Sequence, residues 1–193
     1  MNTVSEEGIA KINTLSKLVL RKRGDSAVAF YNAAGRLYVL HFIEVAQMGG
    51  HRVLYFMLNL AEGKRGGAPD KEVGRMVVAV LTQYLEEHPD ELVCYCHYDN
   101  VKSNALNRIF HLWERVNQDV IDGKITFFDG AGHNREGDGL HFMVIHHLQC
   151  KDIAELKTYI LENSDAFATN VREQIVLLLD INRQMRQLDH AVC

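Results

Sequence analysis

The chain has 193 residues, of which 47% are hydrophobic and 24% charged, and its formal net charge is −4. This length and composition are typical of a globular protein that folds around its own core without a disulfide or metal. The acidic balance argues against a dedicated duplex-DNA binder, because neutralised phosphates supply most of the non-specific affinity of such proteins. We therefore expect no nucleic-acid partner.

The cysteines and the N-terminus indicate the compartment. Cys94 and Cys96 lie two residues apart in an apolar run, where a disulfide between them would be strained. The segment Met1–Glu7 lacks the basic-then-apolar pattern of a signal peptide, and no apolar run is long enough to cross a membrane. Zinc spacings such as Cys-x-x-Cys are absent, so we expect no metal. These features predict a cytoplasmic protein without membrane contact.

Hydrophobic periodicity predicts the elements of the first half of the chain. Ser5 starts a helix over residues 5–20, which Gly24 ends. Two strands joined by a turn at 32–35 follow, and then a strand that is apolar at nearly every position. These three strands are expected at 27–31, 36–45 and 53–60.

A basic, glycine-rich loop at 62–69 leads into the second half, where Asp70 is expected to cap the next helix. Strands are expected at 92–96, 125–128 and 140–146, with a helix over 104–116 after the first of them. The segment 130–139 reads as a long glycine-rich loop, flexible enough for a lid or recognition element. Two helices, at about 152–162 and 165–188, close the chain.

This order predicts an α/β (α+β) fold with a mixed, mainly antiparallel sheet flanked by helices. A helix between the third and fourth strands allows those two strands to run parallel. We expect one domain over residues 1–150, including the helix at 5–20, and a helical extension over 151–193 that packs on it or mediates dimerisation. The last helix places apolar residues at near-heptad spacing with Arg172 on its far side, which predicts a homodimer. The apolar stripe includes Val171, Ile175, Leu178, Leu179, Met185 and Leu188.

The unit formed by strand 53–60, the loop Lys64–Gly67 and the helix from Asp70 resembles the acyl-CoA-dependent N-acetyltransferase (GNAT) fold. The resemblance implies that acetyl-CoA or CoA binds with its pyrophosphate on backbone amides of the loop, at a helix N-terminus. The cofactor-binding residues would be Lys64, Arg65, Gly66 and Gly67. Their register departs from the family pattern, and Asp70 puts a carboxylate where the pyrophosphate would lie, so Asp70 is also interpretable as a simple N-cap.

A second stretch resembles a family of small bacterial proteins of unknown function. The similarity covers about residues 27 to 148 and is densest from Cys94 to Trp113. It includes Asp70-Lys71-Glu72-Val73, Val93-Cys94-Tyr95-Cys96, Asp99, Lys102 and Arg108. This resemblance implies a fold and no activity.

Two residues are candidates for acid–base catalysis. In the acetyltransferase-like fold, Glu62 would be the general base at the end of the third strand, and Tyr98 the general acid after the fourth. The Glu62-Gly63-Lys64 segment also fits the acidic-x-Lys signature of restriction-type nucleases. Such a site needs a second carboxylate near the start of the second strand, where the chain has Gly35-Arg36.

The sequence thus leaves two main hypotheses. The irregular phosphate loop favours a divergent or non-catalytic GNAT-like binding module. The Glu62 and Tyr98 pair favours an acetyl-CoA-dependent N-acyltransferase that acts on an amine. A restriction-endonuclease-like nuclease is a minor alternative.

Overall fold

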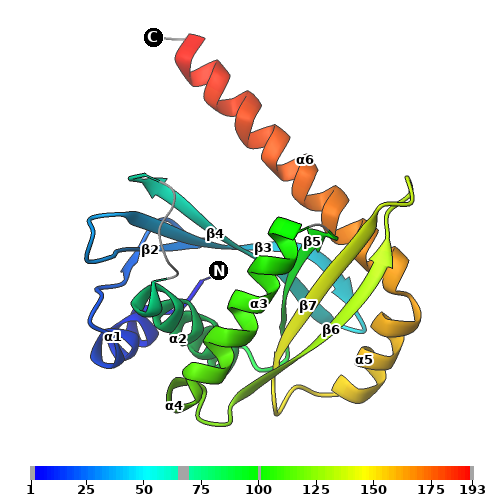
Figure 1. Ribbon diagram of the computed structural model, residues 1–193, viewed down its shortest axis with the longest axis horizontal. Helices are drawn as coiled ribbons and strands as arrows, with labels where there is room; N and C mark the ends of the chain where they lie inside the picture. The colour runs from blue at the N-terminus through cyan, green and yellow to red at the C-terminus, as the bar shows by residue number, and fades with distance from the viewer. Residues whose placement is uncertain (1–2, 65–69, 100, 192–193) are drawn as a thin grey trace.

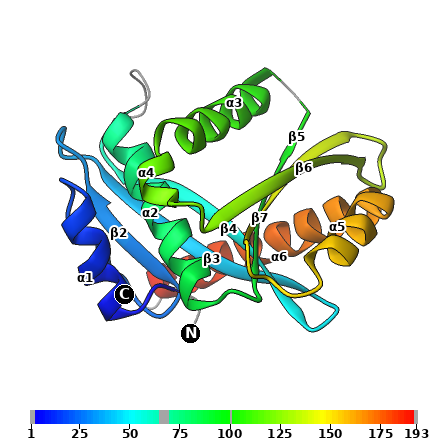
Figure 2. The same cartoon turned by 90° about the horizontal axis from the view of Figure 1, so that it is seen from below.

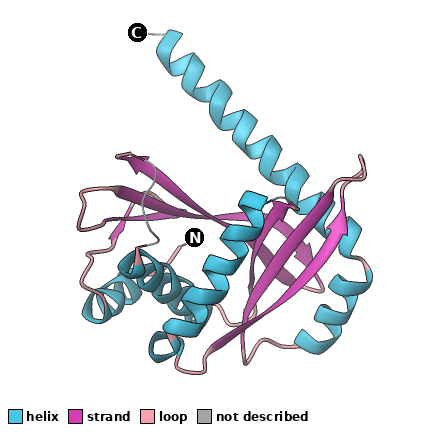
Figure 3. Cartoon of the chain, in the orientation of Figure 1, coloured by secondary structure: helices cyan, strands magenta, loops and turns pink. Residues whose placement is uncertain are grey.

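The computed structural model describes residues 3–64, 70–99 and 101–191, with side chains described for all of these except 101–106 and 178–191. Its centre is one sheet of seven strands in the order β1-β2-β3-β4-β5-β7-β6, with helices on both faces (Figures 1 and 3). Every neighbouring pair is antiparallel except β4 and β5, which are parallel. The predicted mixed, mainly antiparallel sheet is confirmed.

The strands are β1 (Arg21–Lys22), β2 (Ala27–Tyr31), β3 (Leu37–Met48), β4 (His51–Glu62), β5 (Leu92–Tyr98), β6 (Ile125–His133) and β7 (Gly139–His147). The helices are α1 (Glu6–Leu15), α2 (Lys71–Glu87), α3 (Val101–Val116), α4 (Gln118–Ile121), α5 (Ile153–Glu162) and α6 (Ser164–Ala191).

The two faces of the sheet have separate cores. Helices α1 to α4 cover one face, where the buried α2 residues Met76, Val80 and Tyr84 pack with residues of α1 and of β2 to β4 (Figure 2). Helices α5 and α6 cover the other face, where Phe167 packs edge-on against Phe142 of β7 with ring centroids 4.8 Å apart. The α5–α6 extension therefore packs on the α/β domain rather than forming a separate unit.

The first helix is shorter than predicted, because α1 ends at Leu15 instead of residue 20. Asn13 binds the backbone of Leu20 through both side-chain atoms, which turns the chain back towards the sheet. Leu18 and Leu20 then enter the core at a spacing of two residues, which is an extended rather than a helical pattern. Directly after the predicted helix, Arg21–Lys22 form strand β1, which pairs with β2 and was not predicted.

The predicted loop at 130–139 is also wrong, because β6 runs to His133 and β7 starts at Gly139. Gly130 and Gly132 lie in β6, where the ring of Phe142 and the backbone of Ser164 approach them closely. A Cβ at Gly130 would lie 2.1 Å from Phe142 Cζ, and a Cβ at Gly132 would lie 2.7 Å from the Ser164 carbonyl oxygen. They serve packing against β7 and α6, and the remaining connection is only residues 134–138.

The predicted apolar stripe of α6 is described over its first part. Val171 and Ile175 of the predicted stripe are buried in the core that α6 shares with the sheet. The rest of the stripe, from Leu178 onward, lies outside the described side chains. Among the helices of the described residues, none is both long and apolar enough to cross a membrane.

Candidate functional site at the opening between two strands

Strands β4 and β5 pair over only three residue pairs, from Val53–Leu92 to Tyr55–Cys94. Beyond them β4 remains paired with β3 as far as Glu62, and β5 remains paired with β7 as far as Tyr98. The two halves of the sheet therefore diverge and leave what we call the β4/β5 opening (Figure 1).

Aromatic side chains fill the narrow end of this opening. Phe110 of α3 packs against Phe56 of β4 and Tyr95 of β5, with ring centroids 5.4 and 5.0 Å apart. On the other face, the Tyr55 hydroxyl donates a hydrogen bond of 3.5 Å to the Cys96 carbonyl oxygen. This bond links the two strands just where their own pairing has ended.

A cation from α6 lies beside the same opening. The guanidinium of Arg172 lies 4.7 Å from the centre of the Tyr98 ring, a cation–π geometry. Arg172 Nε is buried and has no hydrogen-bond partner, and no described carboxylate forms an ion pair with this side chain. Burial raises the pKa of the Cys96 thiol to about 12, while the positive charge of Arg172 acts in the opposite direction.

The two predicted catalytic residues lie on either side of the opening. Glu62 accepts a 3.3 Å hydrogen bond from the Tyr31 hydroxyl. Tyr98 is the residue whose ring contacts the Arg172 guanidinium. At about 3.3 Å per residue, Glu62 lies about 23 Å and Tyr98 about 13 Å beyond the last β4–β5 pair. The carboxylate and the phenol therefore lie at different distances along two diverging strands.

The predicted cofactor loop is described in part. Lys64 is exposed after Gly63, and Arg65, Gly66 and Gly67 lie outside the described residues. At the entrance of α2, Asp70 Oδ1 accepts hydrogen bonds from the amides of Glu72 and Val73, at 3.0 and 3.4 Å. Its Oδ2 accepts one of 2.9 Å from Asn32. Asp70 is therefore the predicted N-cap, and it already occupies first-turn amides that a phosphate would need.

The described residues do not provide the metal site that a nuclease needs. Among the described residues, no group of three histidine, cysteine or acidic side chains is placed to hold a metal ion. Strand β3 starts at Leu37, so the position that a nuclease site needs remains without an acid. Cys94 and Cys96 are free thiols whose pKa values are raised by burial.

Comparison of the chain with protein-family models, curated proteins and solved structures found no match. The fold and the site define it as an α/β protein whose sheet opens between two parallel strands. Arg172 is the residue that the sequence interpretation placed wrongly, since periodicity put it on the outer side of the last helix. Tyr55 was missed because it reads as one more core residue of an apolar strand.

Proposed function

We propose that this protein is a divergent, non-catalytic member of the GNAT-like fold that binds an anionic ligand at the β4/β5 opening. The observation on which the proposal rests is Arg172, a half-buried cation whose Nε has no hydrogen-bond partner. A carboxylate or phosphate would supply both the missing acceptor and the missing negative charge. Because guanidinium–oxyanion hydrogen bonds are charge-assisted, they are among the stronger polar contacts in proteins.

The relation to the GNAT-like fold is supported by the sheet. The α2 crossover joins two parallel strands, β4 and β5, that separate after three residue pairs. A splayed pair of this kind is what the resemblance implies for an acyl-CoA site. The buried free thiols of Cys94, Cys96 and Cys150 support the proposed location in a reducing cytoplasm.

Two features favour binding over acyl transfer. The Asp70 carboxylate competes with any phosphate for the first amides of α2. A general base and a general acid must both reach the reacting groups, whereas Glu62 lies about 23 Å and Tyr98 about 13 Å beyond the last β4–β5 pair, on two diverging strands.

Calorimetry with pyrophosphate, glutarate, CoA and acetyl-CoA tests this proposal. We expect pyrophosphate or glutarate to bind the wild type, and Arg172→Met to weaken that binding about tenfold or more, as expected for the loss of a charge-assisted contact. The paired substitution Lys64→Ala/Arg65→Ala should leave the binding of these small anions unchanged.

The same titrations separate the alternatives. Tight acetyl-CoA binding that Lys64→Ala/Arg65→Ala abolishes, together with CoA release in the presence of amines, would support an N-acyltransferase with catalytic Glu62 and Tyr98. If none of the four compounds gives heat with the wild type, or if Arg172→Met changes nothing, the binding proposal is wrong.

We also propose that the protein forms a homodimer through α6. Val176 and Leu177 are 47% and 53% exposed, although both are large apolar side chains, and they directly follow the buried Ile175. Light scattering should report a dimer for the wild type and a monomer for Val176→Glu/Leu177→Glu. A wild-type monomer at about 100 μM would contradict this, since a functional dimer is expected to be at least micromolar in affinity.

A further inference from the structure

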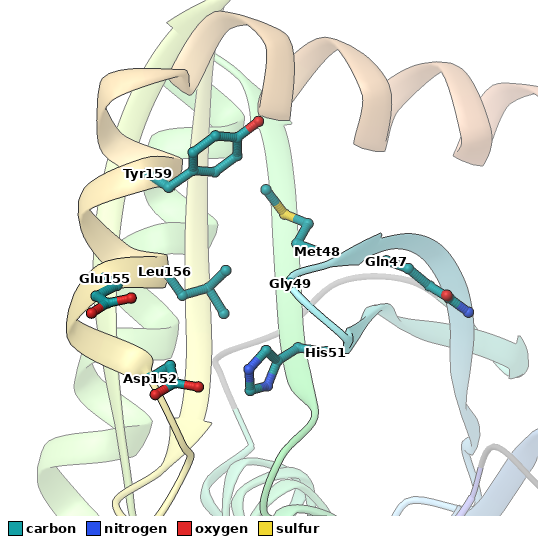
Figure 4. Close-up of a pocket in the computed structure, with 8 residues that line it drawn as sticks. All are labelled: Gln47, Met48, Gly49, His51, Asp152, Glu155, Leu156 and Tyr159. Atoms are coloured by element: carbon teal, nitrogen blue, oxygen red, sulfur yellow. The ribbon is translucent and has the colours of Figure 1, made fainter.

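A cavity lies at the hairpin end of β4, away from Arg172 and Tyr98. Its volume is about 640 Å3, which suits one small organic molecule. One wall is the turn between β3 and β4, and the other is α5 (Figure 4). We call it the hairpin cavity; its lining is Gln47, Met48, Gly49, His51, Asp152, Glu155, Leu156 and Tyr159.

The local sequence explains why His51 faces this cavity. Gly49 and Gly50 have φ values of +57° and +88°, and Met48 pairs with His51, which is the geometry of a two-residue hairpin with a type I′ turn. His51 is thereby fixed as the first residue of β4. Its side chain points towards α5, as does that of Met48, while Leu156 and Tyr159 point back from α5 (Figure 4).

The hydrogen bonding of His51 fixes which ring nitrogen is available. His51 is only 7% exposed, and its Nδ1 lies 2.7 Å from the Asp90 carbonyl oxygen. A carbonyl only accepts hydrogen bonds, so Nδ1 carries the hydrogen in the neutral ring and Nε2 is the acceptor. No described residue donates to Nε2. The Nε2 acceptor of this cavity-lining ring can therefore take an N–H or O–H from a ligand.

The charge of the cavity specifies the ligand further. Asp152 begins α5 in a left-handed conformation, with φ of 52°, and its carboxylate makes no capping hydrogen bond. Neither Asp152 nor Glu155 takes part in an ion pair among the described residues. Tyr159, 56% exposed, offers an aromatic face beside these two carboxylates.

We infer that the hairpin cavity binds a small protonated alkylamine. Asp152 and Glu155 attract the ammonium group, and an ammonium N–H donates to His51 Nε2. Met48, Leu156 and the Tyr159 ring contact the alkyl chain. Because His51 requires a hydrogen donor, the cavity prefers primary ammonium ions to quaternary ones, which have the same charge and no N–H.

Three probes with the same alkyl chain test this inference: hexylamine, N-hexyltrimethylammonium and hexanoate. In NMR titrations, hexylamine should bind with a dissociation constant of about 1 mM or tighter and shift the His51 Nε2 signal. The quaternary ion should bind about tenfold more weakly, as expected for loss of one hydrogen bond. Hexanoate should not bind.

Substitutions of the carboxylates complete the test. Asp152→Asn keeps a residue that tolerates the left-handed conformation, and Glu155→Gln is a neutral replacement at an exposed position. Together they should weaken hexylamine binding at least tenfold, while the control Glu162→Gln at the far end of α5 should have no effect. Equal binding of the primary and quaternary ions, binding that survives both substitutions, or no binding of hexylamine would overturn the inference.

Discussion

Two regions of the molecule have opposite charges that the described residues do not balance. Where β4 separates from β5, Arg172 brings a cation without a described carboxylate partner. At the hairpin end, Asp152 and Glu155 bring two carboxylates without a described basic partner. In both places the α/β domain supplies the walls, and a helix of the C-terminal extension supplies the charge. If both proposals hold, the C-terminal extension takes part in ligand recognition as well as in packing.

The largest expected effect comes from loosening α6. Phe167→Ala removes a ring that is 4% exposed and packs on Phe142, so it should lower the free energy of unfolding by about 3–5 kcal/mol. Urea unfolding followed by the fluorescence of Trp113, the single tryptophan, measures this loss. Gln174→Ala, at an exposed position of the same helix, should cost less than about 0.5 kcal/mol. Similar losses in the two variants would show that α6 is not anchored on β7 as described.

A smaller effect is expected at the start of α2, where a carboxylate of the chain occupies the helix amides. Asp70→Ala should cost about 1 kcal/mol of stability through loss of the N-cap. It should also allow pyrophosphate to bind at the freed α2 amides, even when Arg172→Met has removed the other anion site, because a negative charge is removed there. Asp70→Ser keeps a cap without the charge and should recover most of the stability. If Asp70→Ala/Arg172→Met does not bind pyrophosphate, Asp70 does not block a phosphate site at α2.

Arg172→Met should leave the stability unchanged or raise it by up to about 1 kcal/mol. Methionine keeps much of the apolar contact and removes a buried, unpaired polar atom, which outweighs the lost cation–π contact. Thermal unfolding compares the variant with the wild type, and Arg75→Met provides the contrast because Arg75 forms an ion pair with Asp119 at 2.7 Å. A loss above about 1 kcal/mol for Arg172→Met would assign Arg172 a structural role instead.

The smallest expected effect is on the pKa of His97, and His146 serves as the comparison. Burial lowers the pKa of His97, with a smaller contribution from the charge of Arg172, and burial likewise lowers the pKa of His146 near Lys157. Below the ordinary histidine pKa of about 6.5 the unfolded chain binds protons more readily, so both groups reduce stability as the pH falls through that value. In an NMR titration, Arg172→Met should raise the pKa of His97 and leave that of His146 unchanged. Equal shifts of both would contradict the local effect of Arg172.

The sequence predicted the sheet because its buried strands and α2 have strong apolar patterns bounded by clear turn residues. The turn at Asn32–Gly35 is confirmed by hydrogen bonds from the Ala34 and Arg36 amides to the Asn32 side chain and by a positive φ at Gly35. The end of α1 was not predictable, because it depends on the tertiary contact of Asn13 with Leu20. Likewise, Gly130 and Gly132 are typical of a loop unless their packing partners, which are distant in sequence, are known.

The sites were harder to predict than the fold. Both depend on where α5 and α6 cross the sheet, and helical periodicity does not give that information. Arg172 has the spacing of an exposed residue, yet it lies over Tyr98. His51 follows two glycines that signal a tight turn, but its free Nε2 depends on the carbonyl of Asp90, thirty-nine positions away in sequence.

The most direct test of the central claim is the NMR signal of the Arg172 Nε–H group, assigned by its loss in Arg172→Met, during a titration with pyrophosphate. We expect this signal to shift saturably, with the same dissociation constant as calorimetry gives, because the unpartnered Nε–H gains an oxyanion acceptor. If pyrophosphate binds while the Arg172 signal stays unchanged, or if it does not bind at all, the β4/β5 opening is not an anion site.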